Sequence, residues 1–167
     1  MSGSTSDLKT DVLAAIVRAL REELARQTTA AESSREEAIS EESRPENKWD
    51  THSQEAAYLA EGQARLASEI SGAIAQYQAL SPKPFGTTEP AALGALVGVA
   101  PASSGTIQWY FLGPQGGGLE LQVAGRQVLV VTPASPLGRQ LLGRRRGDAV
   151  RLPGKGGGVG LAVVSIE

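Results

Sequence analysis

The chain has 167 residues, of which 41% are hydrophobic, 20% charged and only 4% aromatic. These values are typical of one or two small globular domains with aliphatic cores, and they exclude a fully disordered protein. The absence of cysteine excludes disulfides and thiolate chemistry and favours a reducing compartment. No secretory signal and no apolar run of roughly 18 residues is found, so we expect a cytoplasmic protein without membrane contact.

The formal net charge of −2 is unevenly distributed along the chain. Residues 1–80 hold 8 Lys/Arg and 14 Asp/Glu, a net charge of −6, whereas residues 81–167 hold 8 and 4, a net charge of +4. An acidic half joined to a basic half predicts two domains with different electrostatic tasks.

A first helix is expected at the start of the acidic half. Apolar residues recur there at spacings of three and four, and they are Leu8, Val12, Ile16, Ala19, Leu20 and Leu24. Thr5 or Ser6 provides an N-cap. Pro45 removes a backbone donor and disfavours helical geometry at Arg44, so the helix should end near Ser43.

A second helix is expected to begin near Thr51 or Ser53 and to reach residue 79. Its apolar stripe consists of Leu59, Leu66, Ile70, Ile74 (or Ala73) and Tyr77. Two narrow stripes separated by a short break predict two antiparallel helices packed as a coiled-coil hairpin over residues 1–79.

Carboxylates gather in the turn between the two expected helices, at Glu41, Glu42, Glu46 and Asp50. The plain explanation is a solvated turn. Mg²⁺ takes oxygen ligands, often one or two carboxylates with water and phosphate completing the shell, so this turn would not bind Mg²⁺ tightly alone. Inserted beside an existing metal ion, it could help to hold a second one and to orient a water molecule for phosphodiester chemistry.

The basic half has a different pattern. Residues 80–90 hold three prolines and are expected to form a linker. Short β-rich runs follow over residues 91–167, and these are TIQWYFL, LELQV, QVLVV, AVRL and VGLAVVSI. Gly116–Gly118 and Gly154–Gly158 are expected to be hairpin turns. One short helix should begin at Ser135 with Pro136 at its first position. The expected fold class is therefore α+β, a helical hairpin followed by a small antiparallel β domain.

Other motifs argue against a self-sufficient enzyme. GKGGG at 154–158 lacks the spacing of a phosphate loop, and the single histidine, His52, has no second histidine or cysteine for a metal site. A basic patch is expected from Arg139, Arg144, Arg145, Arg146, Arg151 and Lys155. Nucleic acid and an acidic protein surface are both possible partners, and the scarcity of aromatic residues disfavours direct nucleic-acid binding.

Three segments resemble the bacterial Gre transcript-cleavage (elongation) factors. SPLGRQLLGRRRGD at 135–148 is similar to their C-terminal signature, and LPGKGGGVGLAVVSIE resembles their Pro-Gly-Gly hairpin and final strand. PENKWDTHSQEAAYLAEGQARLASEI resembles their Glu-Asn tip and the Tyr-containing helix after it. The resemblance implies an N-terminal coiled-coil hairpin with its tip near 41–50 and an FKBP-like C-terminal domain at 91–167.

The resemblance also implies a function. The C-terminal domain would dock at the rim of the RNA polymerase secondary channel through residues of the signature, namely Ser135, Pro136, Leu137, Gly138, Arg139, Leu142 and Arg144. The hairpin of a monomer would enter the channel, where Glu42, Glu46 and Asp50 help the polymerase to cleave backtracked RNA. Glu46 and Asp50 would help to place a second Mg²⁺ shared with the polymerase, and contact with nascent RNA would be indirect.

One position departs from the family pattern. The family has an Asp three residues before the Glu-Asn pair, whereas this chain has Ser43 before Glu46 and Asn47. Glu42 and Asp50 lie on either side, so a rearranged pair is one alternative and a channel regulator without cleavage activity is another. A coiled-coil adaptor with no polymerase partner and a prolyl isomerase also remain, the latter disfavoured by the few aromatic residues available for a pocket.

Overall fold

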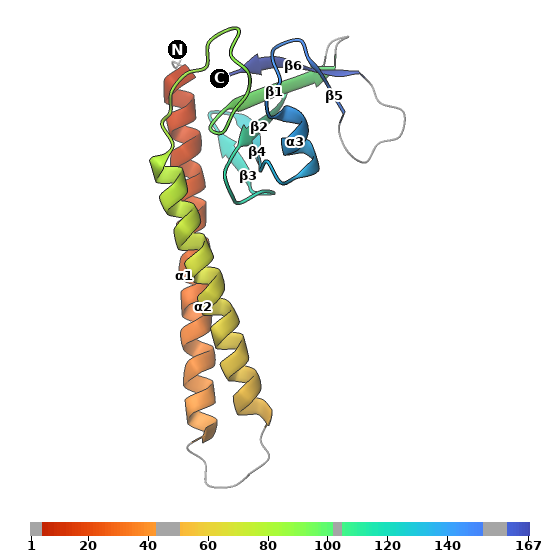
Figure 1. Cartoon of the computed structure of the whole chain (residues 1–167). Helices are drawn as coiled ribbons and strands as arrows, with labels where there is room; N and C mark the ends of the chain where they lie inside the picture. The colour runs from red at the N-terminus through yellow and green to blue at the C-terminus, as the bar shows by residue number, and fades with distance from the viewer. Residues whose placement is uncertain (1–4, 43–50, 102–104, 152–159) are drawn as a thin grey trace. The chain divides into compact units, whose positions relative to one another are not determined.

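The computed structural model describes residues 5–42, 51–101, 105–151 and 160–167 (Figure 1). The elements are α1 (Thr5–Glu42), α2 (Thr51–Ala79), β1 (Leu96–Pro101), β2 (Gln108–Leu112), β3 (Glu120–Val123), β4 (Arg126–Val131), α3 (Pro136–Leu141), β5 (Ala149–Val150) and β6 (Leu161–Ile166). The predicted class, a helical hairpin followed by a small β domain with one short helix, is confirmed. None of the helices within the described ranges is long and apolar enough to cross a membrane.

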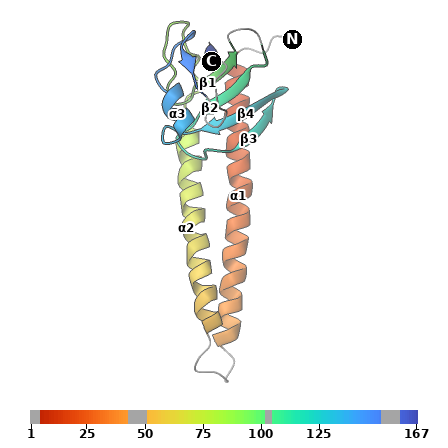
Figure 2. The same cartoon turned by 90° about the vertical axis from the view of Figure 1, so that its right-hand side faces the viewer.

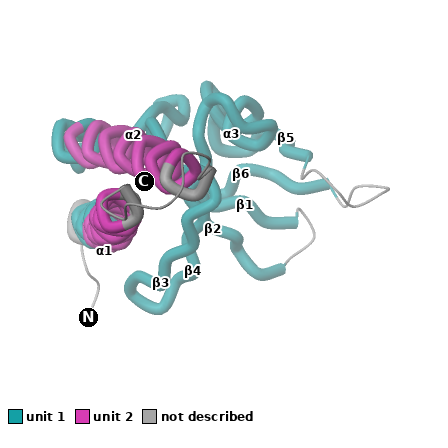
Figure 3. Tube along the Cα trace, turned by 90° about the horizontal axis from the view of Figure 1, so that it is seen from below, with its two compact units in different colours: residues 1–17, 76–167 teal, residues 18–75 magenta. Residues whose placement is uncertain are grey.

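The chain forms two compact units, residues 18–75 and residues 1–17 with 76–167 (Figure 3). The first turns of α1 and the end of α2 therefore belong to the same unit as the sheet. Residues 80–90 lack regular secondary structure, as expected, but Phe85 in this segment packs against the core of the β domain. The domain limits predicted from the sequence stay a prediction.

Residues 18–75 form a hairpin of two antiparallel helices that lie side by side (Figures 1 and 2). α1 has 38 residues and ends at Glu42, one residue before the predicted Ser43, and α2 has 29 residues and begins at the predicted Thr51. The Ser34 hydroxyl is buried and donates to Gln63 Oε1 across the hairpin at 3.3 Å.

The stripe predicted for α2 is wrong at two of its positions. Leu59 and Leu66 are 56% and 40% exposed. The shielded residues are instead spaced alternately by four and three, and they are Ala56, Ala60, Gln63, Ala67, Ile70, Ile74 and Tyr77. This spacing is an unbroken heptad stripe, and its small members let the two helices approach closely, so the larger leucines are left outside.

The sheet is mixed rather than purely antiparallel. Its strand order is β3-β4-β2-β1-β6-β5. β2 and β4 run parallel, with Trp109 opposite Val128, and the other neighbouring pairs are antiparallel. Gly116–Gly118 is consequently not a hairpin turn, because it joins β2 to β3 and these strands are not neighbours. The turn between β3 and β4 is Ala124–Gly125, both with positive φ. Gly154–Gly158 lies outside the described residues.

The central strand β1 was not expected from the sequence. It pairs with β2 on one side and β6 on the other, with a register shift between Gly98 and Val99. A glycine inside a short apolar run weakens the strand signal. Here Gly98 lies under the side chains of Ile107 and Trp109, since a Cβ at this residue would lie 3.0 and 3.1 Å from their atoms.

The core of the β domain lies between one face of the sheet and α3. It consists of Ala91, Ala95, Val97, Val99, Tyr110, Leu112, Val131, Leu137, Leu141, Val150, Val163 and Ile166. Phe111 alternates with Tyr110 and Leu112 and so lies on the opposite face. Its ring is 6.4 Å from that of Tyr77, the last large buried residue of α2.

Candidate functional site

The predicted short helix is the centre of the candidate site. Ser135 has extended backbone geometry and caps α3, because its Oγ accepts from Gly138 N at 3.0 Å and donates to Thr132 O at 2.8 Å. Pro136 occupies the first helical turn, where the missing N–H costs nothing. Gly138 is required because a Cβ there would lie 1.8 Å from Thr132 O. The predicted start of the helix is confirmed.

The end of α3 is fixed by two glycines and one aspartate. Gly143 and Gly147 have φ values of 78° and 90°, which favour glycine. Gly143 N donates to Ala91 O, and Ala91 N donates to Arg144 O, both at 2.7 Å. Asp148 Oδ2 accepts from Arg145 N at 2.8 Å before the chain enters β5. The signature therefore has a local structural reason at its Ser, Pro, Gly and Asp positions.

The residues predicted to bind polymerase divide into two groups. Leu137 and Gly138 are buried and hold the helix in place, and Ser135 is half-buried and occupied by its cap. Pro136, Arg139, Leu142 and Arg144 are exposed. The residues of the first group stabilise the conformation of α3 and its cap. The residues of the second group are exposed and available for contact with a partner. Polymerase binding by these residues stays a prediction.

Most residues of the predicted basic patch are exposed in one region of the β domain. Arg139, Arg144, Arg145 and Arg151 are exposed around the C-terminal half of α3 and the turn that follows it. The Arg146 guanidinium donates to Ile166 O in β6 at 3.1 Å. Lys155 lies outside the described residues.

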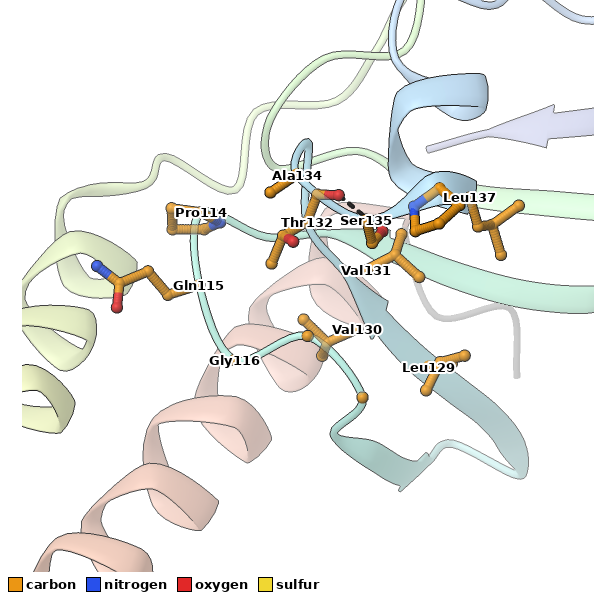
Figure 4. A pocket seen from close by; sticks show the side chains of 13 residues that line it. Pro114, Gln115, Gly116, Leu129, Val130, Val131, Thr132, Ala134, Ser135 and Leu137 are labelled. Carbon is orange, nitrogen blue, oxygen red and sulfur yellow. Dashed lines mark hydrogen bonds between the residues drawn. The ribbon is translucent and has the colours of Figure 1, made fainter. Parts of the chain in front are cut away.

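An open pocket of about 740 Å³ adjoins the start of α3 (Figure 4). Its walls are the loop Pro114–Gly118, the end of β4 and the cap of α3, with Leu129, Val131 and Leu137 among the apolar side chains. None of its lining residues is aromatic. Local sequence patterns do not predict this pocket, because they favour a simple hairpin turn at Gly116–Gly118.

Tyr77 holds one wall of this pocket in place. Its hydroxyl donates to Gln115 O at 2.5 Å, and a Cβ at Gly113 would lie 2.0 Å from its oxygen. Burial raises the pKa of the Tyr77 phenol, while the bond to Gln115 acts in the opposite direction. The end of α2 is thereby connected to the loop between β2 and β3.

Lys9 is a buried cation that the sequence analysis missed. It is 1% exposed, its ammonium group donates to Lys83 O, and it lies 4.5 Å from the centre of the Phe85 ring. Burial lowers its pKa to about 8, and the charges of Glu167 and Glu89 oppose this shift. The available signal was its spacing, because Lys9 lies three residues before Val12 and seven before Ile16, two members of the predicted apolar stripe.

The predicted tip residues cannot be placed. Glu46 and Asp50 lie outside the described residues, and Glu42 is the last residue of α1, with no described side chain. Within the described ranges, no group of three or more histidine, cysteine, aspartate or glutamate side chains could hold a metal ion. The Mg²⁺ prediction therefore rests on the sequence.

Comparisons with known proteins gave matches among solved structures. No family model and no curated protein matches the chain. A crystal structure of GreA factor homolog 1 (Gfh1) of Thermus thermophilus is 20% identical, with 90% of this chain and 94% of that chain covered and a TM-score of 0.39. Thermus aquaticus Gfh1 is 20% identical, with 89% and 92% covered and a TM-score of 0.38. A structure described as the transcription factor Gfh1 is 19% identical, with 91% and 93% covered and a TM-score of 0.36.

Proposed function

We propose that this chain is an RNA polymerase-binding transcription factor of the Gre type that acts through the secondary channel. One observation carries the proposal most. An antiparallel helical hairpin precedes a small β domain in which the Gre-like signature forms α3 and its two flanking turns. In this proposal the β domain docks on the polymerase, and the hairpin carries the segment 43–50 to the active site.

The proposed activity is stimulation of RNA cleavage rather than independent catalysis. In this proposal Glu42 and the segment 43–50 supply the carboxylates, and Glu46 and Asp50 would hold a second Mg²⁺ together with the polymerase. A metal ion in such a position lowers the pKa of its bound water and stabilises charge at the phosphate. The part of this chain would be to bring carboxylate oxygens as ligands to that metal ion.

Ser43 favours a second candidate function. A serine at the position where the family pattern has an aspartate removes one expected Mg²⁺ ligand. A chain that occupies the channel without a working carboxylate pair would compete with cleavage factors and regulate the polymerase instead.

A transcript-cleavage assay separates these candidates. The protein is added to a backtracked elongation complex of its own polymerase in Mg²⁺, and RNA shortening is measured. We expect shortening that Glu46→Ala abolishes while polymerase binding is retained. Glu61→Ala, which removes an exposed carboxylate from α2, is the matched control and should leave shortening unchanged.

Two other results have different meanings. If the RNA stays intact and a cleavage factor is displaced, the protein is a channel regulator. If the protein neither shortens RNA nor binds polymerase, the proposal is wrong and the adaptor hypothesis replaces it.

A further inference from the structure

The surface at the end of α3 is strongly basic, and no ion pair among the described residues neutralises it. Residues 135–151 hold five arginines and a single acidic residue, Asp148, whose Oδ2 accepts from a backbone N–H. The ion pairs found in the described ranges join Arg26 to Glu23, Arg65 to Glu69 and Arg126 to Glu167, and none includes these five arginines. A cluster of like charges without neutralising partners destabilises the isolated fold, so a binding role explains it better than a stabilising one.

Four of these arginines donate to main-chain carbonyls, and Arg146 does so through its bond to Ile166 O in β6. Arg139 Nη1 donates to Ala134 O at 2.8 Å, and Arg144 Nε donates to Gln140 O at 3.0 Å. The Arg145 guanidinium donates to Thr88 O, so the segment at residue 88 lies beside the turn after α3. Each bond uses one of five N–H donors and leaves others for a partner. A side chain that is already oriented loses less conformational entropy when it binds.

Two large apolar side chains are exposed on the segments that meet at the end of α3. Leu142, which ends α3, is 43% exposed, and Leu93 is 44% exposed. Leu93 follows two residues after Ala91, which is hydrogen-bonded on both sides to residues 143 and 144. Exposed leucines among arginines are typical of protein interfaces, which place an apolar centre inside a polar rim. A nucleic-acid surface would instead present aromatic side chains for stacking, and Leu93, Leu142 and these arginines offer none.

We infer that Arg139, Arg144 and Arg145, with Leu142 and Leu93, form a docking surface for an acidic protein surface that itself has an apolar spot. This surface is called the arginine face below. The inference rests on the proposed function, because the partner is the polymerase, and it adds the chemistry of the contact. Arginine pairs with carboxylates through two parallel N–H···O bonds, so the partner should present Asp or Glu side chains around the apolar spot.

The test is the affinity of the full chain for its own core polymerase at several salt concentrations. We expect the double variant Arg144→Glu/Arg145→Glu to raise Kd by about tenfold or more at low salt, and we expect the wild-type Kd to rise steeply between roughly 50 and 300 mM KCl. The control is Lys83→Glu, which reverses a charge at an exposed residue that belongs neither to the hairpin nor to the arginine face. It should bind like the wild type.

A second variant tests the apolar part. Leu142→Ser keeps every charge and removes an exposed side chain, so we expect Kd to rise by about threefold with an unchanged salt dependence. Circular dichroism of all variants checks that the fold is retained.

The outcomes are distinguishable. If the wild type binds polymerase but the arginine variant and its control bind equally well, the arginine face is not the docking surface and only this inference fails. If the wild type does not bind polymerase at any salt concentration, the proposed function fails as well. Tight binding of a labelled single-stranded RNA that depends on Arg144 and Arg145 would overturn the inference in favour of a nucleic-acid partner.

Discussion

Lys9 shows how one buried residue can control the pH dependence of stability. Its pKa is about 8 in the fold, below its usual value of 10.5. Between these two values the unfolded chain binds more protons than the folded chain, so stability rises as the pH rises. Tyr77 and Tyr110 have raised pKa values in the fold, so they reduce stability only as the pH passes the usual value of 10.0.

We therefore predict that the free energy of unfolding increases by about 2 kcal/mol between pH 8 and pH 10. Urea unfolding at each pH measures it. Lys9→Met should remove this increase, because the apolar stem is kept and the titrating group is lost. Lys83→Met, at an exposed lysine that contributes only its carbonyl to Lys9, should retain the increase. If the free energy of unfolding of Lys9→Met and of Lys83→Met depended on pH in the same way, Lys9 would not be the cause of the increase.

Gly113 is the second residue with a specific requirement. A Cβ there would lie 2.0 Å from the Tyr77 hydroxyl oxygen and 3.0 Å from Val130 Cγ1. We predict that Gly113→Ala lowers the free energy of unfolding by about 2 kcal/mol, as measured by urea unfolding, because the Tyr77 ring must move.

Two further variants control this result. In a Tyr77→Phe background, Gly113→Ala should cost less stability than it does in the wild type. The reason is that the hydroxyl oxygen, the atom closest to the added Cβ, is absent there. Gly72→Ala in α2 has open space around its Cβ and should instead raise stability by about 0.5–1 kcal/mol. A Gly113→Ala variant as stable as the wild type would show that Tyr77 does not rest against this residue.

At the scale of elements, the hairpin was predictable from the sequence, and so was the part of its contact stripe made by Ile70, Ile74 and Tyr77, whereas Leu59 and Leu66 were wrong. Pro45 and the break in apolar periodicity predicted the end of α1 and the start of α2. Hydrophobicity favoured Leu59 and Leu66 for the seam, whereas close packing selects the heptad of Ala60, Gln63 and Ile70. A rule that weights residues by hydrophobicity cannot detect a seam made of small side chains.

This difference has a measurable consequence. We predict that Ile70→Ala costs about 2–4 kcal/mol of stability, whereas Leu66→Ala costs less than about 1 kcal/mol, because only the first leaves a cavity in a packed seam. Chemical unfolding of the whole chain compares them directly. Similar losses for both variants would mean that Leu66, despite its exposure, contributes to the seam.

The β domain shows the same division between local and distant information. Ser135 and Pro136 predict the start of α3, because helix capping depends on residues that are adjacent in sequence. The structure has the helix at this position. The pairing of β2 with β4, the central place of β1 and the role of Tyr77 depend on residues far apart in sequence, which no local pattern contains. Of the candidate site, the signature was recognised, but the arrangement of Arg145 beside Thr88 required the fold.

At the scale of the whole molecule, the grouping of residues 1–17 and 76–79 with the sheet predicts a stability effect. A fragment of residues 91–167 lacks Tyr77, Phe85 and the first turns of α1. We predict that its β1 amides exchange hydrogen faster than those of the full chain, by roughly a hundredfold or more, corresponding to about 3 kcal/mol. Equal protection would show that the predicted domain limit at residue 91 is sufficient for a stable fold.

The pairing of β1 with β6 also bears on synthesis. Val97 and Ile166 are register partners, although almost 70 residues separate them. A ribosome adds roughly 5–20 residues per second, so one side of β1 waits on the order of 3 to 14 seconds for its neighbour. The hairpin is synthesised before the sheet, so its two helices can pair while the sheet is still incomplete. The nascent chain thus presents a finished coiled coil beside an incomplete sheet with an open edge, and this interval is when it is most exposed to aggregation or to chaperones.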